Sequence, residues 1–167
     1  MNEPYAASTG FYSGSTAMSS LDDTWATPRS YYEKVAKEFD FTLDAAALQS
    51  STLVPENWYG PDHADPDRRD AFTRDWTADA KGGVIWLNPP YGKTIKEWMK
   101  KADEESKKGS TVVCLVPSRT DTAWFHDSCI HHEVRYIRGR LKFGQAVNAA
   151  PFPSALVVMR PKPETKG

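Results

Sequence analysis

Apolar residues follow two spacings along the chain, one typical of helices and one typical of buried strands. Helical spacing recurs over 31–39 and over 95–108, and a third helix is expected to begin near 120. Short β-branched and aromatic runs predict strands at 39–43, 84–87, 111–116, 134–137 and 155–159. Because helices and strands alternate through most of the chain, we expect an α/β fold with a mainly parallel sheet and helices on both faces.

The last two predicted strands are joined by a segment without a helical pattern, so we expect them to form an antiparallel hairpin at one edge of the sheet. A Pro- and Asp-rich segment is expected to hold a short strand near 52–54 and a strand or turn near 70–72. We expect a single domain over residues 21–162. It is preceded by a flexible tail of residues 1–20, rich in Ser, Thr, Gly and Ala, and followed by a short tail, 163–167.

The most informative stretch is Asn88-Pro89-Pro90-Tyr91, directly after the apolar run 84–87. A residue that precedes proline is pushed out of the helical region, and each proline fixes its own φ and brings no N–H group. The stretch therefore predicts a stiff loop with free carbonyl groups and a presented side-chain amide. It lies at the C-terminal end of a strand, where open α/β sheets bind ligands.

This loop suits methyl transfer to a planar NH2 group, whose lone pair is delocalised and therefore weakly nucleophilic. Two acceptors that hold its two hydrogens favour a pyramidal nitrogen and direct the lone pair at the methyl donor. We predict that the Asn88 side-chain oxygen and the Pro89 carbonyl are these acceptors, placed where charge develops. Pro90 stiffens the loop, and Tyr91 offers a flat face on which a flipped-out base stacks. The alternative is a proline-stiffened connection without a chemical role.

The balance of charged residues shows no overall basic excess that would favour a nucleic-acid partner. The chain of 167 residues has 21 Lys and Arg against 22 Asp and Glu, so any contact with nucleic acid must come from a local basic patch. No apolar run approaches membrane-spanning length, and no charged segment followed by an apolar stretch marks a signal peptide. We therefore expect no membrane partner and a cytoplasmic protein.

Two cysteines do not suggest a disulfide framework, which fits a reducing compartment. Cys129 lies near His126, His131 and His132, but this spacing fits neither a paired-cysteine zinc site nor a metalloprotease helix. The sequence pattern therefore predicts no metal site.

Several blocks in the same order resemble the small, phage-type DNA N6-adenine methyltransferases, the Dam-like family. The blocks are Trp25-Ala26-Thr27-Pro28, Phe41-Thr42-Leu43-Asp44-Ala45-Ala46, Asn88–Gly92, Pro117-Ser118-Arg119-Thr120-Asp121-Thr122 with Trp124-Phe125-His126, and Gly139-Arg140-Leu141-Lys142-Phe143. The resemblance spans most of residues 23–160. It implies a Rossmann-like methyltransferase fold, S-adenosylmethionine as the methyl donor, and a flipped adenine in double-stranded DNA as the acceptor.

The resemblance places Asp44, Ala45 and Ala46 where the first strand meets the cofactor. Small alanines allow the backbone to approach closely, and Asp44 is expected to meet the ammonium group of the methionine part. Many methyltransferases have a glycine-rich loop at this point, and this chain has none. The alternative role for Asp44 is a helix N-cap.

The same resemblance places Trp25, Ala26, Thr27 and Pro28 over the cofactor, and Asp70 beside its adenine amine. The alternative for the first segment is a hydrophobic staple with Thr27 as N-cap and Pro28 at the first helical position. Several acids compete for the ribose hydroxyls, about 20 residues after the first strand: Glu56, Asp62, Asp65 and Asp67.

A set of basic residues and one aromatic residue near the predicted site is expected to contact DNA, mainly at phosphates. The set comprises Lys93, Arg119, Arg138, Arg140, Lys142 and Phe143. Ordinary solvated charge is the alternative for each basic side chain.

The residues alone are compatible with other functions. Protein glutamine methyltransferases that act on release factors also use Asn-Pro-Pro-Tyr, because a glutamine amide presents the same NH2 group. DNA cytosine N4 methylation is a third possible acceptor, and a non-catalytic DNA-binding protein of the same fold is a different class. The blocks Gly139–Phe143 and Arg119–His126 favour DNA, and intact Asn88 and Tyr91 favour catalysis.

Overall fold

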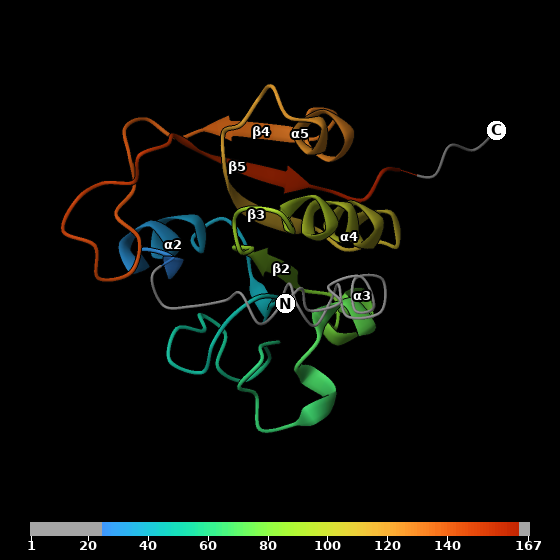
Figure 1. The fold of residues 1–167 in the computed structure, drawn as a ribbon. Coiled ribbons are helices and arrows are strands. Elements are labelled where there is room, and N and C mark those ends of the chain that lie inside the picture. The colour runs from blue at the N-terminus through green and yellow to red at the C-terminus, as the bar shows by residue number, and fades with distance from the viewer. Residues whose placement is uncertain (1–24, 164–167) are drawn as a thin grey trace, which may run out of the picture.

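A five-stranded sheet organises the computed structural model, which describes residues 25–163 (Figure 1). The strand order is β1-β2-β3-β5-β4. Neighbours are parallel from β1 to β3, whereas β5 is antiparallel to both β3 and β4. The strands are β1 (Phe41–Asp44), β2 (Val84–Leu87), β3 (Val112–Pro117), β4 (Glu133–Tyr136) and β5 (Ser154–Met159).

The mixed sheet confirms the prediction of an α/β fold with an antiparallel pair at one edge. The pair is β4 and β5, with β4 outermost, and β5 fills the place between β3 and β4. The predicted tail of residues 1–20 and residues 164–167 lie outside the described part of the chain.

Helices cover both faces of the sheet (Figure 1). Alternation along β2 places Ile85 and Leu87 on one face, where they join Trp98 and Phe125, and Trp86 on the other face, where it joins Val35. The described helices are α2 (Arg29–Val35), α3 (Trp76–Asp79), α4 (Ile95–Lys107) and α5 (Ala123–Ser128), with the 3-10 turns η3 (Pro66–Arg68) and η4 (Ala71–Thr73). None of them is long and apolar enough to cross a bilayer.

The structure corrects several local expectations near the N-terminus. Helix α2 ends at Val35 instead of continuing to Phe39, which packs against Phe41 with 5.9 Å between ring centroids. Its N-cap is Pro28, and no side chain caps it, so the expected cap by Thr27 is wrong.

The segment between β1 and β2 also differs from expectation. Residues 52–54 form no strand, because the Leu53 N–H donates to the Asp44 carboxylate instead of to a neighbouring strand. Residues 71–73 form η4, whose first turn is capped by Asp70. Aspartates likewise cap η3 and α3, so the local order here depends on side chains rather than on an apolar pattern.

Candidate active site

Several loops meet at the carboxyl ends of β1 and β2 and enclose a cleft. One precedes α2, one follows β1, and one is the stiff loop after β2. The residues that line the cleft are Trp25, Ala26, Thr27, Asp44, Ala46, Ala47, Leu48, Ser51, Trp86, Asn88, Pro89 and Pro90. Most of the residues predicted for catalysis and for cofactor binding are therefore side by side in space.

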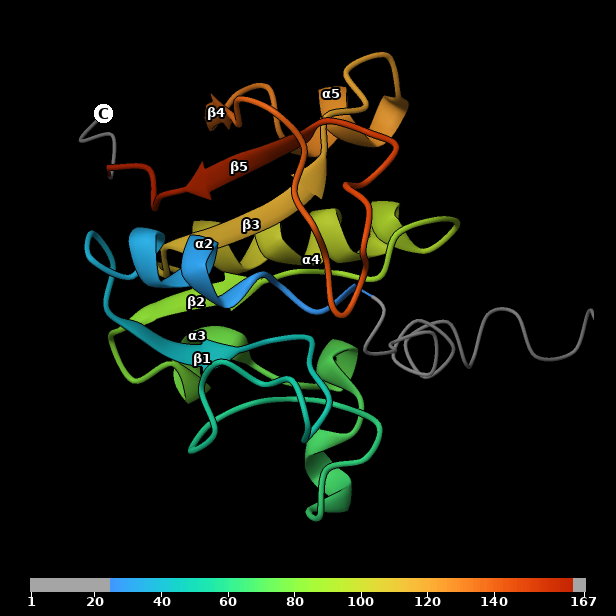
Figure 2. The same ribbon diagram turned by 90° about the vertical axis from the view of Figure 1, so that its left-hand side faces the viewer.

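The connection between β4 and β5 joins this group of loops. Figure 2 shows it reaching down to the segment that precedes α2. The Gly144 N–H donates to the Ala26 carbonyl over 2.9 Å, and the rings of Phe143 and Phe152 each lie 5.6 Å from the ring of Trp25. The loop that we expected to contact DNA is thus attached to the loop that we expected to cover the cofactor.

The side-chain amide of Asn88 is buried and held in one orientation. Its Nδ2 donates to the Trp25 carbonyl over 2.7 Å and to the Thr27 hydroxyl oxygen over 3.0 Å. A backbone carbonyl only accepts hydrogen bonds, so the nitrogen of the amide must face Trp25. The Oδ1 atom is consequently turned the other way, as an acceptor.

Tyr91 lies beside that acceptor. Its hydroxyl is 3.3 Å from Asn88 Oδ1 and 3.4 Å from the Leu115 carbonyl oxygen, and its single hydrogen serves one of them at a time. Burial raises the pKa of Tyr91, so the hydroxyl is protonated at neutral pH. The ring contacts Phe152 and Phe143 edge-on at centroid distances of 5.4 and 6.0 Å. A ring cluster thus fixes Tyr91 next to the amide.

Asp44 is a buried carboxylate, only 2% exposed, at the end of β1. It accepts the Leu53 N–H over 3.0 Å and lies 3.4 Å from the Thr52 hydroxyl and from the Ala46 nitrogen. Burial raises the pKa of Asp44 to about 7, and the three hydrogen bonds oppose that rise. Turns and irregular backbone follow β1, so the alternative role of Asp44 as a helix N-cap is wrong.

The cleft suits a positively charged ligand. It combines the Asp44 carboxylate with the carbonyl-rich Asn88–Pro90 loop. Within residues 25–163, no Lys, Arg or His forms an ion pair with Asp44. A buried acid without a cationic partner is costly unless a ligand neutralises it. A ligand with a cationic group, such as an ammonium group, matches these acceptor oxygens.

Three predicted cofactor residues have other positions. Ala45 is fully buried, and its N–H donates to the Trp86 carbonyl, which joins β1 to β2. Pro28 caps α2 and does not line the cleft. Asp70 caps η4 by accepting the Phe72 N–H over 3.0 Å, and it does not line the cleft either. The predicted contact between Asp70 and the cofactor's adenine amine is therefore not supported.

Among the four competing acids, Asp62 is attached to the cleft wall. Both of its carboxylate oxygens accept the Gln49 N–H, at 3.1 and 3.2 Å, and the adjacent Leu48 lines the cleft. Asp65 instead caps η3. Sequence spacing alone did not separate these acids, because the intervening backbone is irregular.

The five basic residues predicted to contact DNA are all exposed: Lys93, Arg119, Arg138, Arg140 and Lys142. Arg119 lies over the Phe152 ring at 5.8 Å and shares a pocket with Tyr91 and Trp124. Arg138 instead borders a separate groove beside α2 and β4.

Phe143 is 2% exposed and packs in the ring cluster, so it is not available for the predicted DNA contact. Its apolar ring fills the space behind Tyr91. Sequence reasoning also missed Phe152, whose one signal was its place between Pro151 and Pro153.

The sequence is similar to a known protein family and to two phage proteins. One family model, DNA N-6-adenine-methyltransferase (Dam), matches residues 14–166. A protein of Haemophilus phage HP1 (strain HP1c1), named DNA N-6-adenine-methyltransferase, is 29% identical over 150 residues, which cover 84% of this chain and 80% of the relative. A protein of Escherichia phage T1 with the same name is 31% identical over 120 residues, 70% of this chain and 45% of that longer relative.

Proposed function

Because the chain belongs to the DNA N-6-adenine-methyltransferase (Dam) family, we propose that it transfers a methyl group from S-adenosylmethionine to the N6 amine of adenine in DNA. The observation that carries this proposal is the clamped Asn88 amide. Its nitrogen is held by Trp25 and Thr27, so its oxygen is preset to accept a hydrogen from an amine. A preset acceptor needs no reorganisation during the reaction.

The acceptor amine is held by two oxygens, Asn88 Oδ1 and the Pro89 carbonyl. Each accepts one N6 hydrogen, which favours a pyramidal nitrogen with its lone pair free to attack. After the transfer, the N6 nitrogen carries the methyl group, two hydrogens and a positive charge, and it loses one proton to give the neutral product. Neither an amide nor a carbonyl oxygen is basic enough to keep that proton, so it passes to water. Asn88 and Pro89 therefore act by orientation and electrostatics rather than as general bases.

S-adenosylmethionine, when bound, supplies an electrophilic methyl group. The chain's part is to bind and orient it in the cleft between Asp44 and the Asn88–Pro90 loop. Ionised Asp44 pairs with the ammonium group, and the small Ala46 leaves room in the cleft wall. Trp25 and Ala26 close one side, and Asp62 is the acid best placed to reach the ribose hydroxyls.

The adenine amine is out of reach in a stacked duplex, so the target base must flip out of double-stranded DNA. The Tyr91 ring, fixed by its aromatic neighbours, offers the stacking face. Arg119 borders the same pocket, and we assign it, with Lys93, Arg140 and Lys142, to phosphate contacts. Duplex DNA is therefore the proposed partner.

We also infer that the sheet is a Rossmann-like methyltransferase sheet within one catalytic domain, residues 21–162. Parallel β1 and β2 carry the ligand loops at their carboxyl ends, which agrees with ligand binding in open α/β sheets. The antiparallel β5 lies between β3 and β4. We further propose a location in the cytoplasm of the host, because the relatives come from phages.

Transfer of labelled methyl groups from S-adenosylmethionine to unmethylated duplex DNA, followed by mass analysis of the nucleosides, tests this function. We expect the label in N6-methyladenine, with transfer at least about thirtyfold slower in Asn88→Ala. Label in N4-methylcytosine, or in glutamine of an added release factor, overturns the assignment of the acceptor. Cofactor and DNA binding without any transfer identifies a non-catalytic DNA-binding protein instead.

A further inference from the structure

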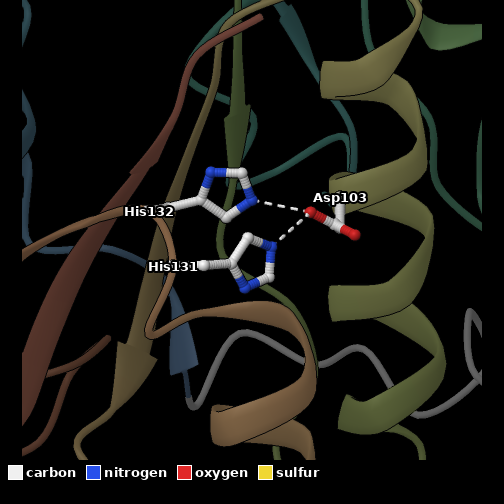
Figure 3. A group of neighbouring side chains, drawn as sticks. All are labelled: Asp103, His131 and His132. Carbon is white, nitrogen blue, oxygen red and sulfur yellow. Dashed lines mark hydrogen bonds and ion pairs between the residues drawn. The ribbon is translucent and has the colours of Figure 1, made fainter. Parts of the chain in front are cut away.

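Three side chains with metal-ligand atoms meet between α4 and the turn that follows α5, and none of them lines the cleft (Figure 3). Asp103 projects from α4, and His131 and His132 are consecutive in the turn. The two Nε2 atoms lie 3.1 Å and 2.6 Å from the same Asp103 oxygen, Oδ1. All three ligand atoms lie within 4.8 Å of one another.

We propose that Asp103, His131 and His132 bind one Zn²⁺ ion, with water as the fourth ligand. Zinc takes imidazole nitrogen at about 2.0–2.1 Å and carboxylate oxygen at about 2.0–2.2 Å in a tetrahedral site, which sets ligand atoms about 3.3 Å apart. The observed separations of 3.1 and 2.6 Å need shifts of less than about 1 Å. Two imidazoles with one carboxylate favour zinc over Mg²⁺ or Ca²⁺, which prefer oxygen ligands alone.

The surroundings allow a metal to enter and hold the ligands in place. The His132 side chain is 5% exposed and Asp103 10%, whereas His131 is 32% exposed and gives water access. A groove between α4 and α5, lined by Asp103 and Ser128, opens onto the same carboxylate.

One cation already contacts the carboxylate: Lys107 Nζ lies 3.0 Å from Oδ2 of Asp103. It uses the oxygen that the imidazoles do not use. The Lys107 side chain is 59% exposed, so it can turn into solvent when a metal neutralises Asp103.

Bound zinc would join two elements that are distant in sequence. Asp103 precedes His131 by 28 residues, so no local spacing reveals the site, and the expectation of no metal rested on His126, Cys129 and the histidine pair alone. Helix α4 follows the Asn88–Tyr91 loop in the chain, so the ion would fasten the helix behind that loop to the turn before β4. The role we assign to it is structural.

The test uses full-length, untagged protein after removal of metal with a chelator. Zn²⁺ titrated calorimetrically should bind one ion per chain. At a hundredfold excess over Kd, it should raise Tm by about 5 °C or more. His131→Ala should weaken binding at least about tenfold and abolish the Tm shift. The matched control is His126→Ala, an exposed histidine of α5 outside the cluster, which should bind Zn²⁺ like the parent protein.

Three results would overturn the proposal. One is the absence of stoichiometric Zn²⁺ binding by the parent protein. Another is an equal loss of affinity in His126→Ala and His131→Ala, which would place the ion elsewhere. The third is a thiolate-to-metal charge-transfer band in the Co²⁺-loaded parent, which would identify a cysteine as a ligand. The Co²⁺ spectrum needs no variant, so it still tests the proposal if His131→Ala fails to fold.

Discussion

Replacing Asp44 with asparagine is expected to stabilise the free protein and, at the same time, to weaken its affinity for S-adenosylmethionine. Asparagine keeps the shape of the side chain and an oxygen that accepts the Leu53 N–H. It removes a charge from a position that is 2% exposed. Opposite effects on stability and binding distinguish a carboxylate kept for a ligand from one kept for the fold.

The magnitude follows from the pKa of Asp44, which burial raises from 3.8 to about 7. Because the folded pKa lies above the unfolded one, ionisation favours the unfolded chain. The penalty is absent below about pH 4, grows as the pH rises toward 7, and is complete above about pH 7. About three pKa units correspond to roughly 4 kcal/mol, which is an upper value for the gain from Asp44→Asn at pH 8. The gain should be smaller at pH 5.

Two measurements at pH 5, 6, 7 and 8 check this reasoning. Urea denaturation gives the free energy of unfolding of both proteins, and calorimetry gives their affinities for S-adenosylmethionine. If ionised Asp44 pairs with the ammonium group, the parent's affinity should fall by up to about tenfold per pH unit below pH 7. At pH 8 the variant should bind at least about tenfold more weakly, with a flat pH profile.

Equal affinities and equal pH profiles in the two proteins would show that Asp44 does not meet the cofactor. A variant no more stable than the parent at pH 8 would show that the carboxylate carries no burial penalty. The first result leaves the rest of the cleft assignment intact, whereas the second removes the physical reason for a cationic ligand.

Four further predictions test the acceptor and DNA sides of the site. Asn88→Ala should raise the barrier to methyl transfer by at least about 2 kcal/mol in single-turnover assays, with cofactor affinity in calorimetry nearly unchanged; near-normal turnover would refute its role. Thr27→Val should slow transfer about fivefold through the loss of one hydrogen bond to Asn88, worth about 1 kcal/mol, whereas Thr27→Ser should restore it; equal rates in Val and Ser variants would contradict the clamp. Tyr91→Ala should lose about 1–3 kcal/mol of stacking with a flipped base in DNA-binding assays, and Tyr91→Phe should keep most activity; a Phe variant as impaired as Ala would point to the hydroxyl instead. Arg140→Glu combined with Lys142→Glu should weaken DNA binding and flatten its salt dependence, measured by fluorescence anisotropy; an unchanged slope would return both residues to ordinary surface charge.

Strands and the long helix were predictable because their signals are local. The run Val84–Leu87 and the stripe Ile95, Trp98, Met99 carry their periodicity within one element, and the structure confirms both. The parallel arrangement of β1 and β2 then brings the residues that follow each strand to one edge. Asp44 and Asn88 therefore line one cleft, as the pattern of strand ends predicts.

The segment between β1 and β2 could not be predicted, because its structure depends on side-chain hydrogen bonds rather than on an apolar pattern. Its short helices are capped by Asp65, Asp70 and Asp75, each of which accepts a nearby N–H group. An aspartate in a Pro-rich sequence is equally compatible with a cap, a turn or a ligand. Asp70 was therefore assigned to the cofactor by position, whereas in the structure it caps η4. Phe143 was assigned to DNA by position in the same way, whereas its ring is buried, because sequence does not distinguish an aromatic ring buried under a site from one exposed beside it.

Thr27 does not have the helix-capping role that its local sequence predicts. Its position before Pro28 indicates a helix N-cap, yet α2 has no side-chain cap, and the hydroxyl accepts a hydrogen bond from Asn88, 61 residues away. A missing cap typically costs a helix about 0.5–2 kcal/mol. Helix stability alone would favour Thr27 as a cap. Its hydroxyl instead bonds to Asn88, which indicates that the orientation of the amide constrains this position. Departures from local rules are expected at functional sites, and here the departure sets the orientation of the amide on which the proposed methyl transfer depends.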